Sequence, residues 1–584
     1  MRKLGIKSRD WKLRYAEKMM PFEIPGISPV ISKILSGRGI QDLKQAHIFL
    51  KPELKNLVEP SSIKGIKESV EKIKEAIENK KKIVIYGDYD VDGIAGVVIL
   101  VRLFELLKYP VNYYIPHRIN EGYGLNKTAI KKLKEDGANL IITVDCGISS
   151  KKEVQYAKDL GIDIIITDHH EPNVHNQALP EAVSIINPKL TDESFIRDLC
   201  GTGVAFKLAW AILNNFSFID RSGPLFHRFI IDAITLAAIG TIADVVPLIG
   251  ENRILVYYGL QSLKACKIPG LKALMNKTRI SGKEIQPKDI AYGLAPRLNA
   301  GGRLSTATKG VELLLSESDT VAEEIAKYLD MANRERQKIE VKILEEVRFK
   351  IQEEYDLSKN PILVVASDAW HPGVIGIVAS RIAEEFYRPA IIISTTKNIG
   401  KGSGRSIPGF HLYNALNSCN HLFESFGGHA LAAGLEIKTE LIPELISHLS
   451  AQTNITPLPV GSAPILIDSE IELSNINRKL SREIDMLQPF GEGNPEPVLA
   501  THNVNLAGQP RLMGRNADHL EFFVKQNNKA FRVVAFGQGQ QIDIIESLKD
   551  EGFSIAYNIR FNDFNGKDDV ELHLKDIKYP NSKQ

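Results

Sequence analysis

Three aspartates stand at alternate positions directly after an apolar segment in the first quarter of the chain. Asp88, Asp90 and Asp92 follow residues 83–86, and Gly93 closes the turn. Carboxylates crowded into one turn repel one another, so a purely stabilising role does not explain them. A cation relieves the repulsion, and hard divalent ions prefer oxygen ligands. The alternative is a solvated acidic loop in which one aspartate caps the following helix, but the spacing favours a metal site.

Two further apolar segments run into residues of the same chemical kind. Residues 140–144 lead into Asp145, and residues 162–167 lead into the tripeptide Asp168-His169-His170. Apolar strands that alternate with helical segments predict a doubly wound parallel sheet in an α/β domain. Ligands of such sheets bind beyond the carboxyl ends of the strands. Core packing explains the strands but not the ligand-type residue at each end, so we expect these side chains to converge on one site.

A fourth carboxylate, Asp244, follows a long apolar segment. Alone, an aspartate shortly before Pro247 more often marks a helix end or a turn, but the other acidic strand ends make it a candidate metal ligand. The apolar segment 230–249 is long enough to suggest a membrane span. Because Asp232, Asp244 and Pro247 are costly at bilayer depth, we expect a buried core helix and no membrane segment.

Length and composition predict a multidomain cytoplasmic protein. A chain of 584 residues is too long for one core and is expected to form roughly three or four domains. Lys and Arg (73) nearly balance Asp and Glu (71), so a nucleic-acid-binding role must rest on local patches. No apolar signal core follows the basic N-terminus. The cysteines form no CxxC pair, which argues against a zinc ribbon or a disulfide framework and fits a reducing cytosol; they are Cys146, Cys200, Cys266 and Cys419.

Glycine- and arginine-containing segments are candidates for phosphate binding. Residues 291–305 are expected to form a glycine loop in which Arg297 and Arg303 contact phosphate, since guanidinium suits bidentate contacts; a solvated surface loop is the alternative. Two later segments, 400–406 and 426–434, are also rich in glycine. Glycine permits close backbone approach to a ligand, and each segment carries polar anchors, namely Ser403, Arg405 and His429.

The second half of the chain is predicted to hold a long helix, a second α/β lobe and a small barrel. Residues 319–357 contain neither Gly nor Pro and predict one helix that connects two lobes, with a coiled-coil dimer segment as the alternative. The second lobe begins with a strand at 361–366. After residue 495, five short β-type segments with turns between them predict a small barrel, at 498–504, 520–525, 531–536, 554–561 and 570–574.

Basic and aromatic residues are interleaved in the predicted barrel. Proteins that bind single strands use basic side chains for the backbone and aromatic rings for base stacking. In a small barrel, however, about half of the aromatic residues face the core. The pattern is therefore suggestive only; its residues are Arg511, Arg515, Lys525, Lys529, Arg532, Arg560, Phe522, Phe523, Phe531 and Phe561.

These motifs resemble those of the DHH phosphoesterase superfamily and, within it, of the RecJ-like single-strand-specific exonucleases. Four matches occur in order: Asp88-x-Asp90-x-Asp92-Gly93, Asp145, the Asp168-His169-His170 tripeptide and Asp244. Gly427-Gly428-His429 resembles the motif of the DHH-associated domain. Segment 296–303 and the terminal barrel distinguish RecJ-like chains from shorter relatives. The resemblance covers nearly the whole chain from about residue 60, and one difference is Tyr86, where smaller members often have His.

Residues 1–60 mix short helical patterns with prolines and are expected to form an N-terminal arm, and the resemblance implies four regions after it. The first is an α/β DHH domain with a doubly wound parallel sheet, and a connecting helical region follows it. The others are a second α/β DHH-associated domain and an OB-like β-barrel. The expected ranges are 61–250, 251–358, 359–455 and 456–584.

The resemblance also implies an activity. Such a chain is expected to be a two-metal phosphodiesterase, with two Mn²⁺ ions and Mg²⁺ as the alternative metal. It would degrade single-stranded DNA from 5′ to 3′, releasing 5′-mononucleotides, in DNA repair and recombination. A single-strand-binding protein and a recombination helicase are the expected protein partners. Polarity and DNA preference come from the resemblance alone.

Roles for individual residues are carried over from the matching motifs. Asp145 is expected to bridge the two ions. Asp168 and His170 are expected to orient a ligand and to donate to the scissile phosphate, so that the catalytic set is Asp145, Asp168, His169 and His170. The expected metal ligands are Asp88, Asp90, Asp92, Asp145, His169 and Asp244. The expected substrate-binding residues are Arg118, Asn299, Arg303, His371, Ser403, Arg405 and His429.

Two alternative functions belong to different classes. One is a DHH phosphodiesterase that acts on short oligonucleotides, a nucleoside bisphosphate or a cyclic dinucleotide, and the extra barrel argues against so small a substrate. The other is a non-catalytic scaffold in a replication assembly. A scaffold is expected to have lost ligands, whereas this chain retains the whole set.

Overall fold

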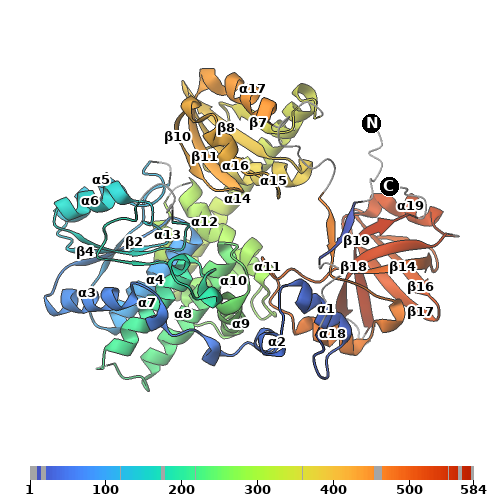
Figure 1. Ribbon diagram of the computed structural model, residues 1–584, viewed down its shortest axis with the longest axis horizontal. Coiled ribbons are helices and arrows are strands. Elements are labelled where there is room, and N and C mark those ends of the chain that lie inside the picture. Colours follow the sequence, from blue (N-terminus) through green and yellow to red (C-terminus); the bar gives the residue numbers. More distant parts are fainter. Residues whose placement is uncertain are drawn as a thin grey trace. The chain divides into compact units, whose positions relative to one another are not determined.

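The computed structural model describes residues 9–14, 22–118, 120–172, 178–217, 219–304, 306–357, 360–452, 463–549, 551–562 and 569–579 (Figure 1). The chain divides into two compact units. The catalytic unit consists of residues 58–246 and 258–461. The barrel unit consists of residues 1–57, 247–257 and 462–584. The N-terminal arm therefore belongs to the same unit as the C-terminal barrel. The domain boundaries expected from the sequence treat the arm and the barrel as separate regions.

The first sheet of the catalytic unit is wholly parallel, as the apolar strand pattern predicts. Its strand order is β3-β2-β4-β5-β6. The chain forms β2 first, then adds β3 on one side of it and β4, β5 and β6 on the other. This is a doubly wound order, and its topological switch point lies beside β2. The strands are β2 (Ile83–Gly87), β3 (Asn112–Tyr114), β4 (Leu140–Val144), β5 (Asp163–Thr167) and β6 (Ser184–Ile186).

Helices cover both faces of this sheet (Figure 1). On one face, Tyr86, Ile141 and Ile164 pack against α5 (Lys127–Glu135) and α6 (Lys151–Asp159). The other face carries α4 and α7, and α8 packs against both of these helices. These helices are apolar almost all round because each is buried between neighbours; they are α4 (Val91–Leu106), α7 (Gly201–Asn215) and α8 (Pro224–Ala243), with α3 (Ile66–Glu78) beside α7.

Helix α8 is the apolar segment that suggested a membrane span. It is the one described helix long and apolar enough to cross a bilayer, and 67% of its most apolar window is buried inside the protein. Its Asp232 pairs with Arg102 of α4 at 3.1 Å. The expected buried core helix is confirmed.

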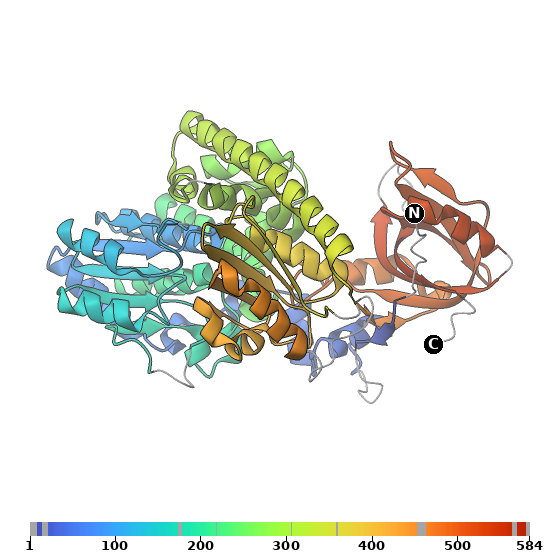
Figure 2. The same ribbon diagram turned by 90° about the horizontal axis from the view of Figure 1, so that it is seen from above.

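A helical region connects the first sheet to the second. The predicted long helix is confirmed as α14 (Asp319–Glu354), which lies yellow-green along the top of Figure 2. It packs against α10, α12, α13 and α15 of the same unit. The preceding elements are α9 (Gly250–Lys264), α10 (Pro269–Thr278), α11 (Pro287–Asp289), the π-helical turn η5 (Ile290–Leu294), α12 (Ala295–Leu304) and α13 (Thr308–Leu315).

The glycine loop expected at 291–305 is wrong, because this segment is helical in η5 and α12. Its glycines serve close packing instead of loop geometry. A Cβ on Gly302 would lie 2.9 Å from the carbonyl oxygen of Tyr89. The bare backbone of α12 thus lies against the turn that carries the three aspartates.

The second lobe holds a mixed sheet of order β10-β11-β9-β8-β7. Only β7 and β8 are parallel, and β9 and β10 each pair antiparallel with β11. The strands are β7 (Leu363–Ser367), β8 (Ala390–Thr396), β9 (Ile399–Arg405), β10 (Phe423–Gly428) and β11 (Ala432–Lys438); the helices are α15 (Ile375–Phe386), α16 (Leu412–Asn417) and α17 (Ile442–Gln452).

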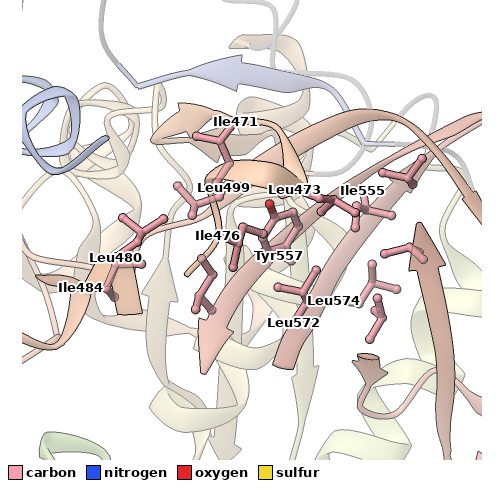
Figure 3. Packing of buried hydrophobic residues seen from close by; sticks show 14 of the residues in the cluster. Ile471, Leu473, Ile476, Leu480, Ile484, Leu499, Ile555, Tyr557, Leu572 and Leu574 are labelled. Atoms are coloured by element: carbon pink, nitrogen blue, oxygen red, sulfur yellow. The ribbon is translucent and has the colours of Figure 1, made fainter. Parts of the chain in front are cut away.

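The barrel unit has a curved sheet of order β13-β14-β18-β19-β17-β16-β15, and an additional β14–β16 pairing closes it. The five predicted strands are all present, as β14 (Leu499–Leu506), β16 (His519–Gln526), β17 (Lys529–Ala535), β18 (Phe553–Asn562) and β19 (Asp569–Lys578). Figure 3 shows Leu499, Ile555, Tyr557 and Leu572 gathered in its core. The remaining elements are α1 (Pro29–Gly37), α2 (Leu43–Leu50), α18 (Arg478–Asp485), α19 (Ile542–Ser547), β13 (Ser469–Glu470) and β15 (Arg511–Met513).

The N-terminal arm is part of this barrel core. Ile31, Ile34 and Leu35 of α1 are fully buried in the same apolar cluster as the barrel strands. Strand β1 (Trp11–Leu13) pairs with β12 (Ile465–Ile467). The arm and the barrel bury apolar surface together, so each is expected to need the other for stability.

A buried arginine joins three separate parts of the barrel unit. Arg253, in the first turn of α9, is 2% exposed and stacks over the Phe49 ring at 3.9 Å. Its guanidinium donates to the carbonyl oxygens of Phe49 (2.8 Å) and Leu487 (2.9 Å). It also donates to the carbonyl oxygens of Met486 (3.2 Å) and Gln488 (2.6 Å). Carbonyl groups that are buried without a donor are costly.

Replacing Arg253 with Met is expected to destabilise the barrel unit by about 3–5 kcal/mol, because the carbonyl acceptors lose a charged donor. Hydrogen exchange measured by mass spectrometry on the full chain checks this. Peptides from β14 to β19 are expected to exchange faster, whereas peptides from β2 and β4 keep their rates. Arg515→Met, at an exposed position of the same unit, is the matched control. Unchanged exchange in the Arg253 variant would contradict the assignment.

Candidate metal centre and phosphate pocket

The acidic residues lie at the switch point of the parallel sheet. Strands β2 and β4 are neighbours there, and their carboxyl ends lead directly into Asp88 and Asp145. The neighbouring strand β5 leads into Asp168 and His169. This is the edge at which open α/β sheets bind ligands, so the predicted convergence is observed.

The turn after β2 is held by the start of α4. Asp90 caps this helix, accepting hydrogen bonds from the backbone N–H groups of Asp92 (2.9 Å) and Gly93 (3.2 Å). The side-chain oxygen of Asn299 accepts the N–H of Val91 at 3.1 Å. A Cβ on Gly93 would lie 2.6 Å from the carbonyl oxygen of Asp88. Only glycine therefore allows the turn to close this tightly.

Asp92 lies at the N-terminus of α7. Its carboxylate accepts the N–H groups of Gly201 (2.6 Å) and Thr202 (2.9 Å) and the hydroxyl of Thr202 (2.6 Å). The partial positive charge of a helix N-terminus stabilises an anion at this place. Motif reasoning predicted Asp92 as a ligand but missed Thr202, because nothing in the local sequence links residues so far apart.

The backbone is strained at two places in the site, at Asp145 and directly after Asp244. Asp145 has φ +63°, in the left-handed region that non-glycine residues seldom occupy. A Cβ on Gly201 would lie 2.5 Å from the Cβ of Asp145, so the glycine makes room for this side chain. Val245, directly after Asp244, has φ +60°. Strain of this kind concentrates at functional sites.

His169 is surrounded by carboxylates. Its Nε2 lies 3.1 Å from Asp145 Oδ1, 3.5 Å from Asp244 Oδ2 and 3.8 Å from Asp92 Oδ2. Burial lowers the pKa of His169 to about 4, although the charge of Asp92 opposes this shift. The imidazole is therefore neutral near pH 7, as a metal ligand must be.

Three groups of ligand atoms have the proximity that a cation needs. One group is Asp88, Asp90 and Asp145, and another is Asp92, His169 and Asp244. The last consists of Asp145, His169 and His170. Asp145 is shared between two of these groups, as is His169, which is the arrangement that closely spaced ions require of bridging ligands.

The electrostatics of the site fit divalent cations. Burial raises the pKa values of Asp88, Asp90, Asp145 and Asp244, and neighbouring carboxylates add to each shift. Oδ1 of Asp88, Oδ1 of Asp145 and Nε2 of His169 are buried without a hydrogen-bond partner among the described residues. Buried, unpaired oxygen atoms of like charge with an imidazole beside them are a donor set suited to Mn²⁺ or Mg²⁺.

Asp168 differs from the other aspartates because it is surrounded by donors. It accepts the N–H groups of Ile148 (2.8 Å), His169 (2.7 Å) and His170 (3.1 Å), and Nδ1 of His170 lies 2.8 Å away. Burial would raise the pKa of Asp168, but these bonds outweigh it and lower the pKa. Burial by itself would lower the pKa of His170, but the hydrogen bond from His170 to Asp168 and the charge of Asp168 raise this pKa overall.

Tyr123 is a site residue that sequence reasoning missed. Its hydroxyl donates to the carbonyl oxygen of Asp145 at 2.9 Å and lies 3.1 Å from Nδ1 of His170. Because the Tyr123 hydroxyl proton is used in the bond to Asp145, the Tyr123 oxygen acts toward His170 as an acceptor. The Nδ1–H of His170 is thus shared between Tyr123 and Asp168. Gly122 and Gly124, both with positive φ, flank the tyrosine. An aromatic residue between two glycines was the available signal.

A pocket of about 340 Å³ lies within the catalytic unit, and two of its lining residues, Arg118 and Arg303, are close enough to Asp90 to interact with it electrostatically. Arg118 and Arg303 line it from the first lobe, and Ser403 and Arg405 from β9. These are four of the predicted substrate-binding residues. Arg118 stacks over the Tyr89 ring at 4.6 Å, and its charge favours the ionised forms of Asp88 and Asp90.

The other predicted substrate-binding residues have different surroundings. Asn299 contacts Val91 at the start of α4. His371 accepts the N–H of Gly373 at 3.1 Å, and Gly373 lines the pocket. His429 is exposed near the β10–β11 hairpin, and partial desolvation of its imidazole, followed by the charge of Arg405, lowers its pKa.

The barrel residues expected to bind single strands divide into two sets. Phe522 is core, with 1% exposure, and Arg532 pairs with Glu521 and Glu571. Arg560 pairs with Glu496, and Phe531 packs against the core. The residues left exposed are Phe523, Arg511, Arg515, Lys525 and Lys529, together with Phe536.

Replacing aspartate with asparagine is expected to have opposite effects on thermal stability at Asp145 and at Asp168. The pKa of Asp145 is raised, so the folded protein without metal holds extra protons and loses stability as the pH rises above the ordinary value of 3.8. Asp168 has a lowered pKa, so its ionised carboxylate contributes stability at pH values above the ordinary pKa of 3.8. At pH 8 in chelator, Asp145→Asn should therefore keep or raise the melting temperature.

Asp168→Asn should lower the melting temperature, by roughly 1 °C for each kcal/mol lost because the catalytic unit is large. Adding Mn²⁺ should then stabilise the unmodified protein more than Asp145→Asn. Thermal unfolding by circular dichroism measures all of these shifts. Shifts of the same sign for the two variants in chelator would refute this electrostatic description.

Comparisons with known proteins show the family to which the chain belongs. Family models match at 82–241 (DHH family, N-terminal domain), 359–454 (DHHA1 domain) and 467–576 (RecJ OB domain). The single-stranded-DNA-specific exonuclease RecJ of Bacillus subtilis is 38% identical over 555 residues, spanning 94% of this chain and 68% of that protein.

Crystal structures of RecJ from Thermus thermophilus are also similar. The complex with Mn²⁺ has a TM-score of 0.79 at 28% identity and covers 98% of this chain and 80% of that one. The complex with Mg²⁺ has a TM-score of 0.74 at 27% identity, covering 98% and 78%. The resemblance inferred from the motifs is confirmed. The chain belongs to the RecJ family of single-stranded-DNA-specific exonucleases, within the DHH phosphoesterases.

Proposed function

We propose that this protein degrades single-stranded DNA from the 5′ end and releases 5′-mononucleotides, with two divalent cations in the carboxylate centre. The observation that carries the proposal is the position of the arginine-lined pocket beside that centre in one unit. A terminal phosphate in the pocket would present the first phosphodiester bond to the carboxylate centre. An enzyme that holds the end of its substrate in this way digests from that end.

Each side chain has a proposed role. Asp88, Asp90, Asp92, Asp145, His169 and Asp244 would hold the cations, with Asp145 as the proposed shared ligand. The cations would supply Lewis-acid chemistry, which neutralises phosphate oxygens and activates water. His170 donates to the scissile phosphate through Nε2, because Asp168 and Tyr123 engage its Nδ1. Asp168 and Tyr123 are thus positioning residues.

The reaction is a hydrolysis with water as the only co-reactant. Water attacks phosphorus and the bond from phosphorus to the 3′ oxygen breaks. The 3′ oxygen leaves with a proton as a hydroxyl group on the released nucleotide. The shortened strand keeps the phosphate at its new 5′ end, which is ready for the pocket in the next cycle.

Metal preference, biological role and partners extend the proposal. Mn²⁺ is the proposed metal, with Mg²⁺ as a substitute, because oxygen ligands with imidazole suit both. We place the activity in DNA repair and recombination in the cytoplasm. A single-strand-binding protein and a recombination helicase are its proposed partners, since both expose or hold single strands.

Asp145→Ala is expected to abolish hydrolysis while leaving the fold intact, because the substitution removes the proposed bridge. An end-labelled single strand of about 30 nucleotides is incubated with Mn²⁺, with Mg²⁺ or with chelator, and the products are resolved on a gel. We expect mononucleotides from the 5′ end with either metal and none with chelator. Loss of activity should reach at least about 10³-fold, as for removal of a main catalytic group.

Asp163→Ala, at the partly exposed start of β5, is the control and should retain activity. Wild-type-like turnover by Asp145→Ala would refute the metal assignment. A blunt duplex of the same sequence is expected to resist digestion, and equal digestion of duplex and single strand would refute the single-strand preference. Faster cleavage of a nucleotide dimer than of the long strand would favour a short-oligonucleotide phosphodiesterase instead.

A further inference from the structure

The arginine-lined pocket holds more positive charge than a terminal phosphate needs. Arg118, Arg303 and Arg405 line it, and none of the described residues that line it is acidic. Arg405 donates to the hydroxyl of Ser403 (3.1 Å) and the carbonyl oxygen of Gly404 (2.8 Å). Arg303 donates to the carbonyl oxygen of Gly373 at 3.2 Å. All of these acceptors are neutral.

A fourth cation in the pocket already has a counter-ion. Lys401 lines the pocket and pairs with Glu436 at 3.3 Å. The three guanidinium groups have no carboxylate within ion-pair distance among the described residues. Burial and mutual repulsion lower the pKa values of Arg303, to about 9, and of Arg405. Asp90 offsets part of the charge of Arg118 and Arg303 at longer range, and the charge that remains favours an anion of high charge in the pocket.

Backbone donors add to the positive field. Gly373, Ile375, Gly376 and Ile377 line the pocket and belong to or adjoin the first turn of α15, a helix of 12 residues. The N–H groups of Gly373 and Ile377 are bonded to His371 and to the carbonyl oxygen of Val374, so those of Ile375 and Gly376 are the donors that remain for a ligand. The first N–H groups of a helix have no acceptor within it, and the helix dipole favours an anion at this end. Guanidinium groups and helix N–H groups thus line the same cavity.

The pocket has room for an anion larger than one phosphate. A water-sized group needs about 10–15 Å³ of probe-occupied space, so a diphosphate of nine heavy atoms needs no more than roughly 140 Å³. The pocket measures about 340 Å³. A phosphomonoester carries at most two negative charges, whereas a diphosphate monoester carries up to three.

We infer that the pocket binds a pyrophosphoryl group, so that strands ending in a 5′-diphosphate are substrates as well as strands ending in a 5′-phosphate. This inference rests on the proposed function. Hydrolysis of the first phosphodiester of such a strand adds water at phosphorus and breaks the bond to the 3′ oxygen. A nucleoside 5′-diphosphate with a 3′-hydroxyl leaves, and the remaining strand carries a 5′-phosphate. The pyrophosphate bond stays intact.

Binding is tested first, in metal-free protein, because pyrophosphate chelates divalent ions. Calorimetric titration with inorganic pyrophosphate should give a Kd about tenfold below that of inorganic phosphate at equal ionic strength, a difference of about 1.4 kcal/mol. Arg405→Gln and Arg118→Gln should remove the preference. Lys397→Gln, an exposed position in the turn of the same sheet, makes the same charge change outside the pocket and should keep it.

Activity is tested with a single strand of one sequence bearing a 5′-phosphate or a 5′-diphosphate. Mass spectrometry of the first released product should find the nucleoside diphosphate from the second strand, at a rate within about threefold of the first. Equal affinity for phosphate and pyrophosphate, or digestion of the 5′-phosphate strand alone, would overturn the inference. Failure to digest either strand would instead refute the proposed function.

Discussion

Buried carboxylates that repel one another are the constraint on which the catalytic unit depends. Asp88, Asp90, Asp145 and Asp244 come from separate places in the chain, and burial among like charges raises each pKa. A fold that served stability alone would separate these groups or pair them. Their retention at one sheet edge is understandable only if cations are part of the working protein.

The remainder of the unit holds these groups in place against their repulsion. The N-terminus of α7 holds Asp92 through backbone donors and Thr202, and Asp90 caps α4. Glycines at 93, 201 and 302 remove side chains where backbone elements must approach closely. Asp168 accepts hydrogen bonds from His170 and from backbone N–H groups, so its pKa is lowered where those of the four repelling aspartates are raised. Its carboxylate orients His170. One sheet edge thus carries aspartates of two kinds.

The sequence predicts those features that depend on local periodicity. The parallel strands, the long helix α14 and the five main barrel strands all follow from apolar spacing, and the acidic strand ends follow from topology. Features set by distant contacts were missed. Glycines in α12 were read as a loop because their packing partner, the turn at Tyr89, lies far away in the sequence. Thr202 and Tyr123 have no local signal strong enough to place them in the site. In the barrel, Phe522 and Phe523 are neighbours of identical type, and only strand register decides which one is exposed.

We propose that two cations share Asp145. Electron paramagnetic resonance of the full chain titrated with Mn²⁺ can detect this sharing, because ions about 3.5–4 Å apart on one carboxylate are magnetically coupled. We expect two Mn²⁺ ions per chain with a spin-coupled spectrum, and isolated-ion signals in Asp145→Asn. A single bound ion, or two ions whose spectra are uncoupled in the unmodified protein, would contradict it.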